Sequence, residues 1–409
     1  MQAWYTYQLL KNQFQDFKQV RTLNRKYFLN TLNNSNKPFI IYKTLKGFDV
    51  YTDFSKKIIL NNKNIIKFLN RKFTQKSKFK DTDLMIGFFG YEILNNLIGI
   101  SLPKQKSINF PKGIFYKPET KVNLKEKFFY SQNSSLKKNK RFNININQNS
   151  YTKIFNKFKK KIRSGETYQI KICTKYKNTS TINALDFFNR LAKTNLAPEA
   201  FLVRDKDFSI ISCSPENLIT KKGYSISTKP IAGTLRKTKK LNKRKALKFF
   251  KNNIKETKEH NMIVDMERND LSRICKPGSV KIKIEKKVEE YKDLYHYVSL
   301  IVGKLQNNIK NIDIIRAMMP GGSVIGCPKI STLNLLNHQE KENRNIYTGS
   351  FGLIKFNGDM RFNIIIRSIL NYKNISEISV ASGVVVDSNA KHEFNENYIK
   401  AKALIDLYK

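Results

Sequence analysis

Cysteine is scarce in this sequence, and its placement excludes several kinds of site. The 409 residues include four cysteines, Cys173, Cys213, Cys275 and Cys327. They lie far apart and form no CxxC pair, which excludes the common zinc-binding and redox dithiol motifs. We therefore expect buried thiols in a reducing compartment, which for this chain is the cytoplasm.

Long apolar runs are also missing. No window reaches the roughly 18 uninterrupted apolar residues that a membrane-spanning helix requires. The opening MQAWYTYQLLKNQ lacks the basic start and apolar stretch of a signal peptide. These absences predict a protein with no membrane partner.

Acidic residues are few compared with basic ones, 32 Asp and Glu against 77 Lys and Arg, for a formal charge of +45. Such a charge raises the hypothesis of a nucleic-acid-binding protein, which steep salt-dependent binding would support. However, lysine is spread from end to end together with Asn and Ile, whereas a binding surface concentrates its charge locally. We interpret the excess as compositional drift and predict no nucleic-acid partner.

The remaining composition is that of a folded protein, with 40% apolar and 12% aromatic residues. A polar tract without periodicity, Ser131 to Lys140, is the best candidate for a linker or exposed loop. We therefore divide the chain into an N-terminal region, 1–140, and a second domain, 141–409. The first region is expected to be integral to the same sheet system.

Hydrophobic periodicity predicts several elements of the second part. Apolar residues at helical spacing indicate a helix over 151–166. The alternation that follows it predicts a strand with Gln169, Lys171 and Cys173 on one face. Nearer the C-terminus, FNIIIRSIL, residues 362–370, is interpreted as one strand.

Paired glutamates recur at helical spacing in two places. The helix expected over Lys255 to Cys275 places Glu256 and Glu259 on one face, and a later helix does the same with Glu393 and Glu396. Two such carboxylates repel each other unless a proton or cation lies between them. Either pair alone is more commonly a solvated helix face. If both pairs converge, the oxygen ligands suit Mg²⁺.

A glycine-rich loop and two isolated residues are further candidates. PGGSVIGCPK, Pro320 to Lys329, lets backbone N–H groups approach an anion, and Lys329 adds positive charge. It lacks the spacing of a P-loop. The SPEN turn exposes Glu216, and His296 lies in an apolar segment, where a lone histidine is more often a core residue than a catalyst.

Taken together and in order, these motifs resemble the chorismate-utilising enzymes, which include the large subunits of aminodeoxychorismate synthase and anthranilate synthase. The motifs that carry the resemblance are SGETYQIKI, SCSPENL, KPIAGTLR, KEHNMIVDMERNDLSRI, HYVS, PGGSVIGCPK, YTGSFG, IIIRS and ASGVVVDS. The resemblance implies an α+β fold of two stacked antiparallel β-sheets flanked by helices. It also implies a cleft that binds chorismate and Mg²⁺.

The resemblance assigns roles to individual residues. Glu256, Glu259, Glu393 and Glu396 match the acidic positions around the metal. Tyr347 and Arg367 match positions that hold the enolpyruvyl carboxylate, and a guanidinium suits that task through its paired donors. The remaining matches are contacts to the ring carboxylate (Gly322, Ser323, Gly383), a histidine near the departing C4 hydroxyl (His296), and further substrate contacts (Thr234, Lys329).

The same resemblance bears on the nucleophile. Isochorismate and salicylate synthases carry a lysine at the position of Gln169, where it activates water. A neutral amide cannot remove a proton in this way, so Gln169 favours an enzyme that uses ammonia, with Glu216 polarising the site or donating a proton. No Cys-His-Glu triad is recognisable here, which implies a separate glutamine amidotransferase subunit that supplies ammonia.

Different motifs of the sequence favour different branches of the family. Ala232 stands where aminodeoxychorismate synthases have the lysine of PIKGT, and PIAGT is typical of anthranilate synthases. PGGS, YTGS and FNIIIR favour the other branch. We predict aminodeoxychorismate synthase component I, with anthranilate synthase component I or an enzyme of both pathways as the alternative.

Overall fold

The computed structural model describes residues 25–71, 78–100, 108–124, 141–238, 241–291 and 294–409. The opening segment and the polar tract Ser131 to Lys140 lie outside these residues. The expected domain boundary, between residues 140 and 141, lies at the edge of that tract. The division of the chain therefore stays a prediction.

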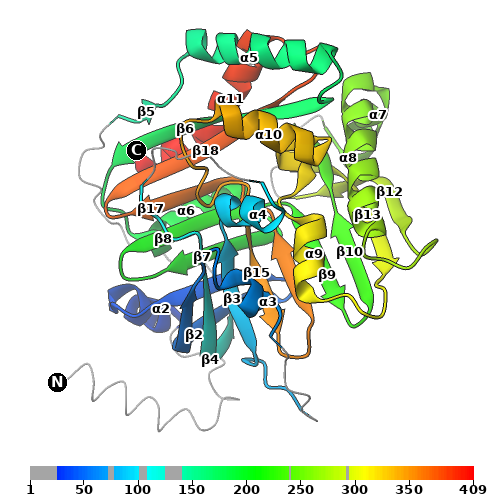
Figure 1. The fold of residues 1–409 in the computed structure, drawn as a ribbon. Helices are drawn as coiled ribbons and strands as arrows, with labels where there is room; N and C mark the ends of the chain where they lie inside the picture. Colours follow the sequence, from blue (N-terminus) through cyan, green and yellow to red (C-terminus); the bar gives the residue numbers. More distant parts are fainter. Residues whose placement is uncertain (1–24, 72–77, 101–107, 125–140, 239–240, 292–293) are drawn as a thin grey trace, which may run out of the picture.

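The described strands form one hydrogen-bonded network in which every pairing is antiparallel (Figure 1). We call its two parts the first and second halves. The first half runs, in spatial order, through β5 (Asn143–Ile144), β6 (Gln169–Thr179), β18 (Ile375–Val384), β17 (Ser368–Tyr372), β8 (Phe208–Ser214), β7 (Glu199–Arg204), β1 (Phe39–Thr44) and β2 (Gly47–Ile59), with β14 (Gly326–Cys327) also on β6.

The second half continues from β2. It runs through β4 (Gly113–Leu124), β3 (Leu84–Phe89), β15 (Ser350–Lys355), β16 (Met360–Asn363), β9 (Asn217–Lys222), β10 (Ser225–Lys229) and β13 (Leu294–Lys304), with β11 (Ile231–Arg236) and β12 (Lys281–Glu290) also on β13. β2 belongs to both halves because it pairs with β1 at one end and with β4 along its length.

The two halves stack face to face. One apolar cluster combines residues of β1, β7, β8 and β17 with residues of β3, β4 and β15. Within it the rings of Phe201 and Phe351, from β7 and β15, stack with centroids 3.8 Å apart. The predicted fold of two stacked antiparallel sheets with helices outside is confirmed.

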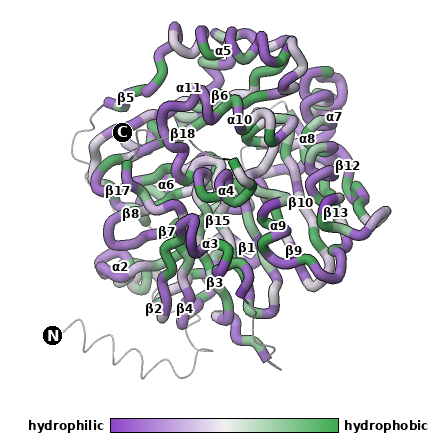
Figure 2. The backbone as a smooth tube through the Cα atoms, in the orientation of Figure 1, coloured by the Kyte–Doolittle hydropathy of each residue, from purple (hydrophilic) through white to green (hydrophobic). Residues whose placement is uncertain are grey.

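Helices cover the outer faces of both halves. The first half packs against α2 (Arg25–Asn34), α6 (Ala184–Asn195), α11 (Ala390–Ile405) and η2 (Asp406–Tyr408). α5 (Gln148–Arg163) and α10 (Lys329–Gln339) also lie on the first half, where α5 contacts β6, β18 and α11 and α10 contacts β6 and β14. The second half packs against α3 (Ile65–Leu69), α4 (Tyr91–Leu97), α8 (Ile254–Ser272), α9 (Asn311–Met318) and η1 (Gly322–Val324), while α7 (Lys243–Asn252) packs on β12 and β13. Hydrophilic residues occur all round the molecule in Figure 2, as expected of a dispersed lysine excess. None of the described helices could cross a membrane.

Local sequence signals account for the helices that carry the glutamates. Asn253 caps α8 by accepting a hydrogen bond from the backbone N–H of Glu256, and Asn389 caps α11 in the same way through two N–H groups. Each cap places a glutamate in the first helical turn, where the helix dipole favours negative charge. The predicted helix over 151–166 corresponds to α5, and the strand predicted after it is β6.

The prediction of one strand over residues 362–370 is wrong. β16 ends at Asn363 and β17 begins at Ser368, because β16 pairs within the second half and β17 within the first. The intervening residues cross between the halves, and Arg367 adopts a φ of 52° there. The chain also passes from the first half to the second between β8 and β9. This crossing lies beside that at Arg367, since the Ile364 N–H donates to the Glu216 carbonyl at 3.1 Å.

Glycine at position 87 is required by the close approach of neighbouring strands. A Cβ there would lie 1.9 Å from the carbonyl oxygen of Ile114. We expect Gly87→Ala to lower the free energy of unfolding by about 3 kcal/mol or more, measured by urea denaturation. Gly165→Ala is the control, because that site has φ +78° and open space, and its expected cost is about 1 kcal/mol. Equal losses in the two variants would contradict the close packing of β3 on β4.

Candidate active site

Glu259, one of the four predicted metal-site glutamates, contacts strand β6. Its Oε1 atom accepts hydrogen bonds from Gln169 Nε2 at 2.9 Å and from Lys171 Nζ at 3.1 Å. Both donors lie on one face of β6, as alternation predicts. Gly383 of β18 pairs with Lys171, and a Cβ at this glycine would lie 2.8 Å from both donor nitrogens. The lack of a side chain at Gly383 therefore makes room for them.

The second glutamate pair lies on α11. Glu393 is 1% exposed, and its Oε1 atom has no hydrogen-bond partner among the described residues. The Nζ atom of Lys255, on α8, lies 3.6 Å from that oxygen, which brings the two helices together. Glu396 pairs with Lys400 at 2.6 Å. His392, Glu393 and Glu396 can direct ligand atoms to within 4.8 Å of one another.

The carboxylates influence one another's ionisation. Burial and the neighbouring Glu259 raise the pKa of Glu256. Burial and Glu396 raise the pKa of Glu393, whereas Lys400 lowers the pKa of Glu396 although burial opposes it. Lys171 holds the pKa of Glu259 at about 2. Each pair thus combines a carboxyl whose pKa is lowered with one whose pKa is raised.

This donor set fits a hard dication. Carboxylate oxygens are the ligands that Mg²⁺ prefers. Glu393 and Glu396 of α11 can direct ligand atoms to within 4.8 Å of one another, and the charge of Glu396 also raises the pKa of Glu256 on α8. The buried Glu393 oxygen without a hydrogen-bond donor is the kind of atom that a cation would satisfy. Glu256 and Glu259 would hold the ion from α8, and Glu393 and Glu396 from α11.

Glu216 and Ser323 form a buried pair. Ser323 Oγ, in η1, donates to Glu216 Oε1 at 2.8 Å. Burial raises the pKa of Glu216 to about 7. A Cβ at the adjacent Gly322 would lie 2.1 Å from Met266 Sδ, so this glycine lets the loop approach α8 closely. The arrangement gives a carboxyl group that can hold a proton near neutral pH.

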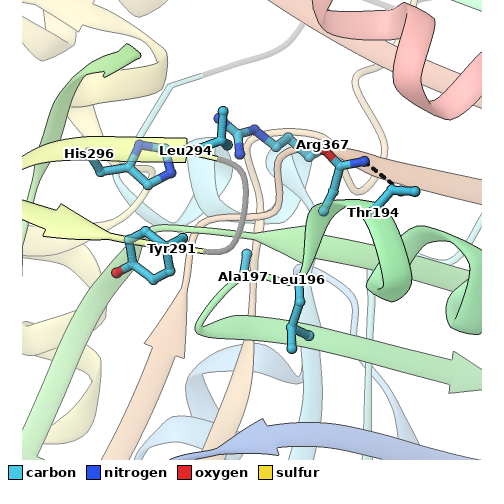
Figure 3. A pocket seen from close by; sticks show the side chains of 8 residues that line it. Thr194, Leu196, Ala197, Tyr291, Leu294, His296 and Arg367 are labelled. Atoms are coloured by element: carbon cyan, nitrogen blue, oxygen red, sulfur yellow. Dashed lines mark hydrogen bonds between the residues drawn. The ribbon is translucent and has the colours of Figure 1, made fainter. Parts of the chain in front are cut away.

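His296 and Arg367 line a small pocket together with Tyr291, Leu196 and Ala197 (Figure 3). His296 Nδ1 lies 3.0 Å from Thr234 Oγ1 across the β11–β13 pair. Burial and the nearby Arg367 lower the pKa of His296 to about 3. The imidazole is therefore neutral at physiological pH and suited to orienting a partner rather than to donating a proton.

The Arg367 guanidinium has no carboxylate within ion-pairing distance among the residues that the structure describes. Burial even lowers its pKa, although it stays a cation at neutral pH. A desolvated cation without a counter-ion that faces a cavity is a site for an anion.

Tyr347 lies in a turn that is held by buried charges. Its ring packs with Cys173 and Ala381. Glu92 accepts the Arg344 backbone N–H at 2.7 Å, and Arg344 Nη2 donates to the Lys171 carbonyl at 3.0 Å. These contacts tie the Tyr347 turn to β6.

The PIAGT loop closes one side of the glutamate cluster. A bulge in β11 lies between Ile231 and Thr234. Within it Ala232 is 4% exposed, and Gly233 has φ +83°. A Cβ at Gly233 would lie 2.9 Å from Glu256 Oε2, which places the loop against the first glutamate pair.

The structure corrects the expectation for Lys329. Its Nζ atom lies 2.5 Å from Asp270 Oδ2 and donates to the Ala317 carbonyl at 3.0 Å, in a buried setting. This ion pair joins α10 to α8, so Lys329 is a packing residue rather than a free charge for an anion. Conversely, no role was predicted for Lys171, although alternation had placed it on the face of Gln169.

Comparison with known proteins identifies the family. The pattern of the family described as chorismate binding enzyme matches residues 30–406. The chain belongs to this family. The resemblance drawn from the motifs is thereby confirmed.

Individual relatives come from two branches. Aminodeoxychorismate synthase component 1 of Bacillus subtilis is 36% identical over 258 residues, 63% of this chain and 55% of that protein. An anthranilate synthase component I-like protein of Synechocystis is 30% identical over 346 residues, 78% of this chain and 71% of its own length. The crystal structure of anthranilate synthase component I from Streptococcus pneumoniae has a TM-score of 0.72 at 25% identity and covers 90% of both chains.

The raised pKa of Glu216 predicts a pH dependence of stability. Because its folded-state pKa of about 7 exceeds the ordinary value of 4.5, the stabilisation by its protonated form is present below pH 4.5. It is lost as the pH rises through about 7. We expect Glu216→Gln to avoid this loss and to become more stable relative to wild type by up to about 3 kcal/mol near pH 8. Chemical denaturation at several pH values measures the difference, and a difference independent of pH would contradict the burial of an ionisable carboxyl.

Proposed function

We propose that this chain is the chorismate-aminating component I of an aminodeoxychorismate synthase, acting with Mg²⁺ towards 4-aminobenzoate. The observation that carries the proposal is the presence, in one site, of a buried Arg367 with no ion-pair partner among the described residues and of two glutamate pairs. A substrate with two carboxylates, such as chorismate, satisfies both features at once. Arg367, supported by Tyr347, would bind the enolpyruvyl carboxylate.

The ring carboxylate would lie towards the glutamate cluster. Mg²⁺ bound there would neutralise that carboxylate and the surrounding glutamates. Ser323, Gly322 and Gly383 line this side by the same assignment. Thr234 would keep the His296 ring oriented towards the C4 hydroxyl through the contact at 3.0 Å.

Proton transfer is best assigned to Glu216. With a pKa of about 7 it retains a proton near neutrality and can give it to the departing hydroxyl. His296, which is neutral, would orient the hydroxyl. Gln169 donates its amide N–H to Glu259 and is no base, which favours ammonia over activated water as the nucleophile.

Ammonia would come from a glutamine amidotransferase subunit. The relative from Bacillus subtilis is named component 1, which supports an enzyme with a second component. We infer such a partner for this chain, and we place the enzyme in the cytoplasm.

Anthranilate synthase component I is the second candidate, and Ala232 is the observation that favours it. Its methyl group is buried in the β11 bulge, so this position offers no amine for a covalent adduct. Direct attack of ammonia at C2 would then lead to anthranilate and pyruvate.

Product analysis separates the two candidates. We expect the purified chain, incubated with chorismate, Mg²⁺ and an ammonium salt, to form aminodeoxychorismate, which an added lyase converts to 4-aminobenzoate. Chromatography with mass detection identifies the product. Anthranilate with released pyruvate would instead assign the chain to the second candidate, and no consumption of chorismate would contradict both.

The metal assignment predicts a large effect at Glu259. Exchange of Glu259 for Gln removes a charged ligand but keeps its shape, so we expect kcat/KM to fall about 100-fold or more while the chain remains folded by circular dichroism. Asp265→Asn on the same helix is the control, because Asp265 is exposed and contacts Arg268. Substantial Mg²⁺-dependent turnover of Glu259→Gln would refute the assignment.

A further inference from the structure

We infer that Lys171 is a built-in counter-cation of the glutamate cluster, which competes with the dication for Glu259 and thereby sets the metal affinity. This inference rests on the proposed function, because it concerns the same cluster. It adds that in the metal-free protein the Lys171 ammonium neutralises Glu259 in place of the dication.

The position of Lys171 supports direct competition. Its Nζ atom lies 3.1 Å from Glu259 Oε1, the oxygen that also accepts from Gln169. The carboxylate therefore already holds two donors on one oxygen. A cation bound through that oxygen would meet the Lys171 ammonium at close range, and like charges at such a distance repel strongly where water is excluded.

Lys171 differs from the other cations around the cluster in its burial. Lys255 and Lys400 also contact glutamates, but their side chains are 51% and 42% exposed. The Lys171 side chain is 13% exposed. The exposed lysines can move into solvent when a metal binds, whereas the Lys171 ammonium stays within the site.

The surroundings of Lys171 are built to receive an ammonium group. The negative charges of Glu259, Glu396 and Glu216 all favour its protonated form. Lys171 therefore interacts both with the proposed metal ligands and with the proposed proton donor. Gly383 leaves the space for its side chain, since a Cβ there would be 2.8 Å from Nζ. The Arg344 guanidinium fixes the backbone of β6 at this residue by donating to its carbonyl at 3.0 Å.

Two consequences follow for the metal-free protein. Lys171 compensates part of the repulsion among the glutamates and so stabilises the fold without a metal. Binding of a dication must displace the ammonium from Glu259 or bear its repulsion, and the two cations are negatively coupled.

The test compares wild type with Lys171 variants. Calorimetry measures the Mg²⁺ affinity of each substrate-free protein, and melting temperatures are recorded in EDTA and in Mg²⁺. We expect Lys171→Met to bind Mg²⁺ about tenfold more tightly than wild type, within the range usual for coupled sites, and to melt lower in EDTA. Lys171→Arg keeps the charge and should bind Mg²⁺ as the wild type does. Lys171→Gln, which keeps a donor for Glu259, serves if the Met variant does not fold.

Lys177→Met is the matched control. Lys177 lies on the same strand and pairs with Glu342, so the variant removes one positive charge without touching the cluster. Its Mg²⁺ affinity should equal that of the wild type. Equal affinities in wild type, Lys171→Met and Lys171→Gln would overturn the inference, as would equal tightening in Lys177→Met. If neither wild type nor variant binds Mg²⁺, the metal assignment of the proposed function fails as well.

Discussion

The confinement of like charges is the constraint on which the rest of the site depends. Burial and neighbouring carboxylates raise the pKa values of Glu256 and Glu393, and Glu396 of α11 contributes to the shift at Glu256 of α8. Such a cluster disfavours the folded state unless cations compensate it. The chain supplies part of this compensation with Lys171, while the buried Glu393 oxygen stays without a hydrogen-bond donor. The remaining deficit is the basis of the proposal that the cluster binds a dication.

Strand order explains how residues so distant in sequence meet. α8 follows β11 and α7 in the second half, and α11 follows β18 of the first. Glu259 of α8 contacts Gln169 and Lys171 of β6, so the site joins the two halves. The chain crosses between the halves beside Glu216 and again at Arg367. These crossings interrupt regular pairing, and each carries a buried charged side chain, Glu216 against Ser323 and Arg367 at the pocket with His296. The interrupted backbone thus carries the groups assigned to proton transfer and anion binding.

Much of this arrangement could be predicted from the sequence, because helical spacing placed each glutamate pair and strand alternation placed Gln169 with Lys171. The family motifs then supplied the stacked sheets. The break at Arg367 could not be predicted, since an unbroken run of isoleucines has the same pattern whether it stays in one sheet or crosses to another. Nor could the pairing of Lys329 with Asp270, because an ion pair between separate helices has no signature in local spacing.

The central claim is that the two glutamate pairs form one metal site. A crystal structure with Mn²⁺ in place of Mg²⁺ and with chorismate tests it most directly, because the anomalous signal locates the ion independently of the surrounding density. The account predicts one peak bounded by Glu256, Glu259, Glu393 and Glu396, with Lys171 moved from Glu259. A peak elsewhere, or an ordered substrate with Lys171 still on Glu259 and no metal peak, would contradict it.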